Sequence, residues 1–306
     1  MADWGLIVIR FALYADLMLL VGLSAFPLYS FTQVEREARA ILPLGALLAC
    51  LALGGLVFSV AGFAISTAAM IGVPLTALDG SMLVLMANET VIGIAWEIRI
   101  SVLAAVLAGL LLVRQSQTVR LAFTLAGGTV ALATLLWSGH AGATEGALGT
   151  AHRISDIAHM VAGALWIGGI AAFGLLLRPA AISQGAARVA VAARALANFS
   201  SVGTITVLII ALTGLFNVFV ITGTDVSFVL QSTYGSLLAA KILLFGAMLG
   251  VAAHNRWNLT PSLQRSLDSQ DSNEAWHRLR VSVGLEAVAG GSVLVLVAWL
   301  GTLSPV

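Results

Sequence analysis

Three of the five histidines in this chain fall in one stretch, from Trp137 to Trp166. It reads WSGHAGATEGALGTAHRISDIAHMVAGALW and contributes His140, His152 and His159. In a chain with only 9% charged residues, so much imidazole in one place indicates a specific chemistry. Neutral imidazole is a common ligand for copper, zinc and iron, so metal binding is the first chemistry to consider.

The spacing of these residues indicates which side chains could act together. If a helix begins near His152, then His152, Asp156 and His159 fall at positions i, i+4 and i+7 and share one face. Asp156 could ligate a metal directly or accept the second ring N–H of a ligating histidine. Glycines between His140 and His152 allow the connection to fold back toward that face. We therefore predict a metal-binding stretch over residues 137–166.

Trp137 lies one helical turn before His140. Its indole could cover a bound cation or anchor the helix in the membrane interface, and both roles stay open. A plainer interpretation of the whole stretch also stays open: these are polar residues of a hydrated loop, of which one or two cap helices.

The available ligand types favour copper. Cys50 is the only cysteine, so neither a disulfide nor a Cys-x-x-Cys metal pair can form within the chain. A site for a soft metal must then use histidine and methionine. Met70, Met82 and Met86 fall in one segment before the histidine stretch. Thioether sulfur suits Cu(I), although methionine is also an ordinary residue of membrane helices.

The composition indicates the scaffold that would carry this site. Hydrophobic residues make up 59% of the 306 residues, and the mean hydropathy is +1.01. A soluble domain is about half apolar and about a quarter charged. The net charge of +1 gives no basic field for nucleic acid. We therefore predict a protein that is embedded in the lipid bilayer and does not bind nucleic acid.

A membrane-spanning helix needs about 20 mostly apolar residues. Eight stretches qualify, and all should be helical because an isolated span must satisfy its backbone groups internally. We predict an all-α bundle of eight transmembrane helices that forms one domain over residues 1–306. The first span should be retained, because no basic region precedes it. The predicted spans are Trp4–Tyr29, Ile41–Ala64, Thr90–Val113, Leu121–Trp137, Ile157–Leu177, Val202–Thr222, Ser236–Ala253 and Val281–Leu303.

Basic residues predict which side of the membrane each loop faces, because Lys and Arg concentrate in cytoplasmic loops. The opposite loops contain a single basic residue, Arg153. Both termini and the histidine stretch are therefore predicted to face the periplasm. Eleven arginines follow the first, third, fifth and seventh spans: Arg36, Arg39, Arg114, Arg120, Arg178, Arg188, Arg194, Arg256, Arg265, Arg278 and Arg280.

The segment from Ser66 to Met86 is apolar enough to suggest a ninth span. A ninth span there would place the arginines of the neighbouring loops on opposite sides of the membrane, against the asymmetry above. We interpret residues 66–87 as a periplasmic lid or re-entrant segment. Helix-breaking and polar residues interrupt it: Gly72, Pro74, Asp79 and Gly80.

Charged residues also lie inside the predicted spans, where they are costly and normally paired or functional. Two interpretations stay open: ion pairs that fix the helix order, or a path for an ion that involves Asp16, Glu97, Arg99 and Lys241. We expect Glu97 and Arg99 to find partners on other helices, because residues two apart on one helix do not face each other. The six are Arg10, Arg99, Lys241, Asp16, Glu97 and Glu286.

Several motifs resemble those of the bacterial copper resistance protein D family. They include WSGHAG, HRISDIAHMVAGALWIGG, ETVIGIAWEIR in the third span, NFSSVGTITVLIIALTG, YGSLLAAKILLF, HNRWNLTP and the closing WLGTLSP. The resemblance covers nearly the whole chain. It implies an eight-span inner-membrane protein, and it places the histidines of the family's G-H and D-x-x-H motifs at His140 and His159. The match at His152 is less close.

The resemblance also implies a function. The family is associated with copper handling, generally as uptake across the inner membrane together with a periplasmic copper carrier. We expect a copper-binding permease rather than an enzyme, since no Walker motif or nucleophile–base pair is visible. We expect the copper carrier to be a separate protein. The alternative is a cytochrome b-like membrane redox protein with one haem near the outer face. Both functions would use the histidine stretch, so the bound metal distinguishes them.

Overall fold

The structure, a computed structural model, describes residues 3–38, 41–112, 116–178, 186–223, 232–259 and 273–304. Every regular element in these ranges is helical. Arg39, Arg114 and Arg265, three of the arginines used to predict the topology, lie outside them. The elements are α1 (Trp4–Ser30), α2 (Gln33–Ala38), α3 (Gly45–Ile71), η1 (Leu75–Ala77), α4 (Gly80–Glu89), α5 (Val91–Leu112), α6 (Gln117–Ala133), η2 (Thr134–Ser138), α7 (His140–Ala143), α8 (Gly146–Leu176), α10 (Ala186–Thr222), α12 (Thr233–His254), η3 (Asn255–Leu259) and α14 (Asn273–Leu300).

Eight spans in the described part of the chain are long and apolar enough to cross a membrane. This confirms the predicted all-helical fold with eight spans. The fourth span continues from α6 into the 3₁₀ segment η2, and the seventh from α12 into the π-helical segment η3. The spans are Trp4–Ser30, Gly45–Ile71, Val91–Leu112, Gln117–Ser138, Gly146–Leu176, Ala190–Thr222, Thr233–Leu259 and Trp276–Leu300.

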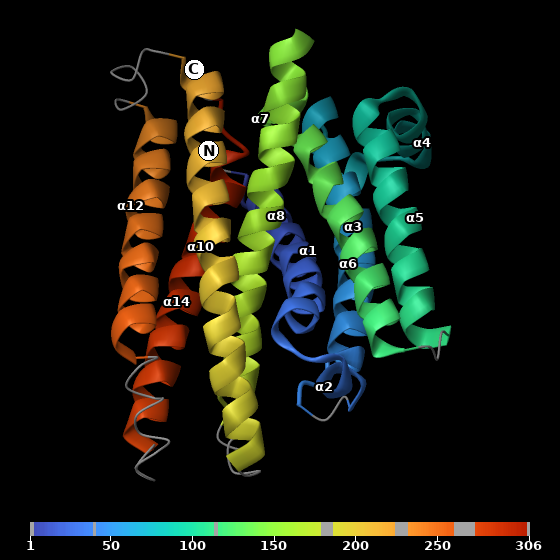
Figure 1. The fold of residues 1–306 in the computed structure, drawn as a ribbon. Helices are drawn as coiled ribbons and strands as arrows, with labels where there is room; N and C mark the ends of the chain where they lie inside the picture. The colour runs from blue at the N-terminus through green and yellow to red at the C-terminus, as the bar shows by residue number, and fades with distance from the viewer. Residues whose placement is uncertain are drawn as a thin grey trace.

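The first helix, α1, lies at the centre of the bundle. It packs against α3 and α6 on one side and against α8 and α14 on the other (Figure 1). Its side chains Leu17, Leu20 and Val21 are fully buried. At Gly22, a Cβ atom would lie only 2.5 Å from the Cα atom of Gly168 on α8, so the two backbones touch. Small residues permit such close helix crossings in membranes.

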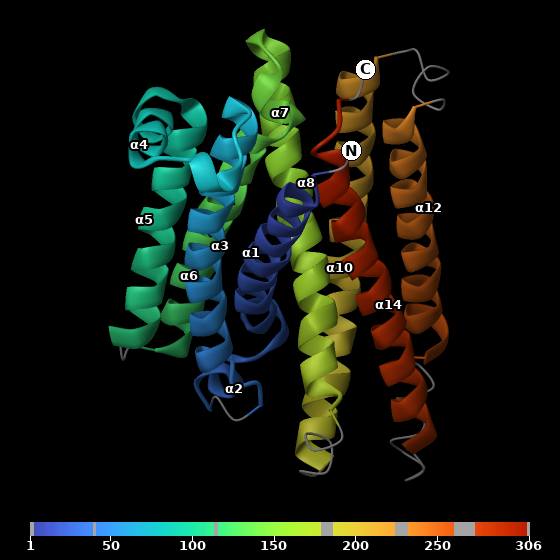
Figure 2. The same cartoon turned by 180° about the vertical axis from the view of Figure 1, so that it is seen from behind.

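The remaining helices form two groups around this centre. In Figure 2, α3, α4, α5 and α6 lie to one side of α1, whereas α10, α12 and α14 lie to the other, with α8 between them. Large apolar side chains on outer faces, such as Ile205, Leu208 and Leu212 of α10, are exposed. Exposed apolar faces of this kind are suited to contact with lipid.

The segment that suggested a ninth span is divided in the structure. Ser66 to Ile71 belong to α3, which ends at Gly72 with a positive φ of 78° that favours glycine. The rest forms η1 and α4, and α4 has 10 residues, which at about 1.5 Å each is too short to cross a bilayer. The Asp79 carboxylate caps α4 by accepting the backbone N–H of Met82 at 3.0 Å, and hydrogen bonds from Ser81 and Met82 lower the pKa of Asp79.

The two termini and α4 lie at one end of the bundle, and α2 lies at the other (Figure 1). At the α2 end, Arg36 donates hydrogen bonds to the carbonyls that end α1, the shortest at 2.6 Å to Phe31. Glu37 accepts the backbone N–H groups of Gln117 and Thr118, at 2.8 and 3.1 Å, which ties α2 to the start of α6. Glu35 pairs with Arg194 of α10. Charged groups therefore fasten the helices together at this end.

Candidate functional site

His159 of α8 faces α10 inside the bundle. Its Nδ1 atom lies 3.0 Å from the hydroxyl oxygen of Thr213. The Thr213 hydroxyl donates its own proton to the backbone carbonyl of Ile209 one turn earlier. With that proton used, Thr213 accepts from the ring, which assigns the proton of a neutral imidazole to Nδ1 and leaves Nε2 as the nitrogen that could ligate a metal. A histidine held in this tautomer can ligate a metal or accept a proton through Nε2.

Asp156 lies one turn before His159 and faces the same helix. Its Oδ1 atom accepts a hydrogen bond of 3.3 Å from the side-chain amide of Asn217. Lys241 of α12 is within electrostatic reach of both Asp156 and His159. The Asn217 amide oxygen is buried and has no hydrogen-bond partner among the described residues. We call Asp156, His159, Thr213, Asn217 and Lys241 the α8 cluster.

A second group of polar side chains adjoins the α8 cluster from α1. Tyr14 is buried, hydrogen-bonds Arg10 and interacts electrostatically with Asp156. Arg10 also donates to the backbone carbonyl of Ser138 at 2.9 Å. Arg99 of α5 is buried, donates to Thr134 at 3.2 Å and lies within electrostatic reach of Tyr14. Ionisable and hydrogen-bonding groups thus extend from α5 through α1 to α12.

The expected partners of Glu97 and Arg99 are found for only one of the two. Arg99 bonds to Thr134, on a different helical span, as expected. Glu97 is exposed on the outer face of α5, and the part of the chain that the structure describes gives it neither a hydrogen bond nor an ion pair. The described residues therefore do not confirm a partner for Glu97, and that expectation stays a prediction. Position in a span does not indicate which face of the helix a residue occupies.

His152, Asp156 and His159 lie on one helix, but they have different neighbours. His152 is buried with 1% of its surface exposed, and its Nδ1 atom lies 2.9 Å from the Thr144 hydroxyl, in the connection before α8. Asp156 and His159 instead face α10.

The ring of Trp137 is covered by the guanidinium of Arg153, whose carbon atom lies 5.6 Å from the ring centroid.

The proposed copper ligands are not gathered into one cluster by the described side chains. No group of three His, Cys, Asp or Glu side chains among them is close enough to hold a metal ion. His140 begins α7, but its side chain lies outside the description, so a site that includes it stays a prediction. Met70 lies in the last turn of α3, and Met82 and Met86 lie on α4. Helix α4 packs against α5 and α3, whereas α8 packs against α1 and α10.

Asp16 of α1 faces away from the α8 cluster, toward α3. Only 7% of it is exposed, and Cβ atoms added at Gly54 and Gly55 would lie within 2.9 Å of its two carboxylate oxygens. Its Oδ2 atom has no hydrogen-bond partner in the described residues. The structure thus gives Asp16 a buried position of its own, separate from Asp156 and Lys241.

Three members of this arrangement were not singled out from the sequence: Tyr14, Thr213 and Asn217. Each is an uncharged polar residue in an apolar helix, and such residues are common in membrane proteins. A signal was present for Asn217, because it is the only Asn or Gln within the predicted spans. Its relation to Asp156, 61 residues earlier, depends on how α8 and α10 pack.

The fold and this arrangement define a class of protein: a multi-pass membrane protein with ionisable side chains inside its helical bundle. Comparison with known proteins gives the family. Residues 1–150 match the copper resistance protein D-like N-terminal domain, and residues 193–300 match copper resistance protein D. The chain belongs to the copper resistance protein D family.

Two relatives are similar over most of the chain. Copper resistance protein D of Pseudomonas syringae pv. tomato is 41% identical over 303 residues, which cover 98% of this chain and 96% of that protein. Inner membrane protein YebZ of Escherichia coli K12 is 28% identical over 210 residues, which cover 69% of this chain and 67% of that protein. No solved structure matches the chain. With eight candidate spans, the chain is a multi-pass inner-membrane protein with a copper-related role.

Proposed function

We propose that this protein binds copper at the periplasmic side of the inner membrane and carries it across, in copper homeostasis and resistance. The observation that supports this most directly is the geometry of His159. An imidazole whose Nδ1 atom is held by Thr213 lies inside a membrane bundle whose family is named for copper resistance. Copper is the substrate in this proposal, and it is not a resident cofactor.

The orientation follows from the charges at the two ends of the bundle. Arg36 lies in α2, Arg194 pairs with Glu35 of α2, and Arg120 lies in the first turn of α6, which Glu37 ties to α2. The positive-inside rule assigns this end to the cytoplasm. The opposite end carries both termini, α4 and the start of α8, and it would face the periplasm. His140 and His152 would then lie where copper arrives, and His159 deeper in the bundle.

The buried charges suggest how a cation could be accepted inside the membrane. Asp156 supplies a carboxyl group one turn from His159, and Lys241 lies within electrostatic reach of it. A cation near Asp156 would compete with Lys241 for the same carboxylate. Asp16 supplies a second buried carboxylate on the far side of α1. We propose His140, His152 and His159 as ligands, with Met70, Met82 and Met86 as soft ligands near the surface.

A separate periplasmic copper carrier is the proposed partner on the outer side. The chain would receive copper from it at the end that carries α4 and α7. We assign no enzymatic reaction to the protein.

The decisive experiment measures cellular copper accumulation and copper bound to the purified protein, for wild type and for His159→Ala. The proposal predicts that both values fall in the variant while its abundance in the membrane stays near that of wild type. His254→Ala is the matched control, since that histidine is exposed at the other end of the bundle. Normal copper binding in His159→Ala would overturn the proposal, and a Soret band with bound iron in the wild-type protein would favour the haem alternative.

A further inference from the structure

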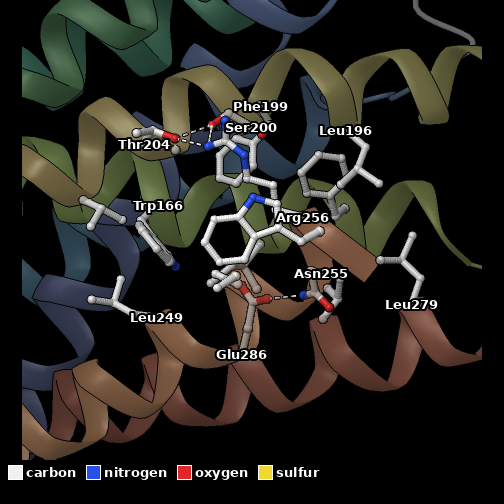
Figure 3. Close-up of a pocket in the computed structure, with 18 residues that line it drawn as sticks. Trp166, Leu196, Phe199, Ser200, Thr204, Leu249, Asn255, Arg256, Leu279 and Glu286 are labelled. Atoms are coloured by element: carbon white, nitrogen blue, oxygen red, sulfur yellow. Dashed lines mark hydrogen bonds between the residues drawn. The ribbon is translucent and has the colours of Figure 1, made fainter. Parts of the chain in front are cut away.

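A cavity of about 330 Å³ lies between four helices of the second half of the chain (Figure 3). It is in the size range of small-molecule sites, about 300–1,000 Å³. Helix α8 contributes Trp166, Ile170 and Phe173, and α10, α12 with η3, and α14 supply the remaining walls. None of these residues belongs to the α8 cluster, so the cavity has no role in the function proposed above.

The cavity opens at the side of the bundle. Helix α10 packs against α8, and α12 packs against α14, whereas no comparable packing joins α10 to α12 in the described residues. Thr204 of α10 and Trp257 of η3 are exposed, and both line the cavity. Arg256 bridges the opening by donating to the hydroxyl of Thr204 and to the backbone carbonyl of Ser200. A ligand would therefore enter from the bilayer, between α10 and α12.

The inner walls are aromatic and apolar. Trp166 and Phe173 of α8 and Phe199 of α10 line the cavity, and the rings of Phe173 and Phe199 meet edge to face at 5.3 Å between centroids. Aromatic walls of this kind favour a flat ring as ligand, because rings stack or meet edge to face.

One polar donor in these walls has no partner. Trp166 is 5% exposed, and its indole N–H makes no hydrogen bond to any described residue. A buried tryptophan usually pairs this group, and leaving it unpaired is unfavourable. An acceptor on a bound molecule would satisfy it.

A buried hydrogen-bonded chain forms the opposite wall. Ser282 of α14 donates to the amide oxygen of Asn255. The Asn255 amide in turn donates to Glu286 (Figure 3). Asn255 is the first residue of η3, the π-helical segment that continues α12. Glu286 is 7% exposed and lines the cavity, so its carboxyl group offers a second polar contact across from Trp166.

We propose that this cavity binds the head ring of a membrane quinone. A quinone presents a flat ring to the aromatic walls and a carbonyl acceptor to the Trp166 N–H. Its apolar tail can stay in the bilayer between α10 and α12. The acyl chain of a phospholipid has no acceptor for the Trp166 N–H, so it satisfies this donor less well. The proposal concerns binding and assigns no electron transfer.

The test is equilibrium binding of decylubiquinone to the purified protein in nanodiscs of synthetic phosphatidylcholine. We expect saturable binding that exceeds that of decylbenzene, which carries the same tail without carbonyl groups. Trp166→Phe keeps a ring but removes the N–H, and it should weaken binding about fivefold. Trp96→Phe is the matched control, because the Trp96 N–H is already bonded to the Ser59 carbonyl on the other side of the bundle.

A second pair of variants tests the cavity itself. Gly203 lines it, so Gly203→Leu should fill it and abolish saturable binding. Gly174→Leu adds the same side chain to α8 in open space and should bind normally. The proposal fails if decylubiquinone and decylbenzene bind alike, if excess phospholipid displaces the quinone, or if Trp166→Phe and Gly203→Leu both bind like wild type.

Discussion

The Nδ1 atom of His159 on α8 lies 3.0 Å from the hydroxyl oxygen of Thr213 on α10. Because the Thr213 hydroxyl is committed as a donor to the Ile209 carbonyl, this contact decides which ring nitrogen of His159 is free. The free Nε2 atom is the one a metal would use. The packing of α8 against α10 therefore affects how His159 could bind a metal, and replacing Thr213 tests this.

Replacing Thr213 by valine should weaken copper binding while His159 itself is unchanged. The variant keeps the shape of the side chain but removes the acceptor that fixes the ring tautomer and its orientation. Loss of such a supporting hydrogen bond lowers metal affinity about 10- to 100-fold. The measurement is competition for Cu(I) with a chelator of known affinity. Thr213→Ser keeps the hydroxyl and should bind like wild type. Thr222→Val, which removes a hydroxyl bonded to Val218 on the same helix, is the control.

Asp156 and Lys241 should depend on each other for folding. Removing one leaves the other as an unbalanced charge inside the membrane, which is costly. Lys241→Met alone and Asp156→Asn alone should each reduce the amount of protein in the membrane several-fold, because a change of about 1–2 kcal/mol has that effect on abundance. The double variant should recover abundance, as measured by quantitative immunoblotting of membranes.

The same double variant separates structure from transport. If Asp156 receives the copper ion, the double variant should be abundant but should not accumulate copper. Normal copper accumulation by an abundant double variant would show that the two residues serve the fold alone.

The link between α2 and α6 should make stability depend on pH through Glu37. Hydrogen bonds from the backbone N–H groups of Gln117 and Thr118 lower the pKa of Glu37 from 4.5 to about 2. A lowered folded-state pKa contributes stability that is fully present above pH 4.5 and is lost as the pH falls through about 2. Glu37→Gln should therefore melt below wild type at pH 7, with a smaller difference at pH 3.

Thermal unfolding of the purified protein in detergent would measure this difference. Glu89→Gln, at the exposed end of α4, should melt like wild type at both pH values. An unchanged melting temperature for Glu37→Gln at pH 7 would show that the contact of α2 with α6 adds no stability.

The sequence was sufficient to predict the eight-helix bundle because the hydrophobic length of each span can be recognised on its own. About 20 apolar residues predict a membrane helix without knowledge of its neighbours, and all eight predicted spans appear in the structure. The boundaries were less certain: α8 begins at Gly146, whereas the predicted span begins at Ile157. Polar residues such as His152 and Asp156 lower the hydropathy there, but they are satisfied within the bundle.

The site was only partly predictable, because it depends on the faces that the helices turn toward each other. Asp156, His159 and Lys241 stood out as ionisable residues in an apolar chain, and the structure brings them together. Glu97 stood out equally, but it lies on an exposed face. All apolar positions of a membrane helix look alike in sequence, since lipid and protein interior favour the same side chains. Thr213 gave no signal for the same reason, and Asn217 stood out only as an amide in an apolar span, with no indication of its partner.

The orientation in the membrane is the remaining prediction, and the two ends of the bundle provide the means to test it. Thr76 in η1 and Gln33 in α2 are exposed at opposite ends. Each can be replaced by cysteine in a Cys50→Ala background, which removes the single native thiol. The arginines at the α2 end predict that a membrane-impermeant maleimide added to spheroplasts labels Thr76→Cys and does not label Gln33→Cys until the membrane is opened. The reverse pattern would place both termini in the cytoplasm, and the direction proposed for copper would then have to be reversed.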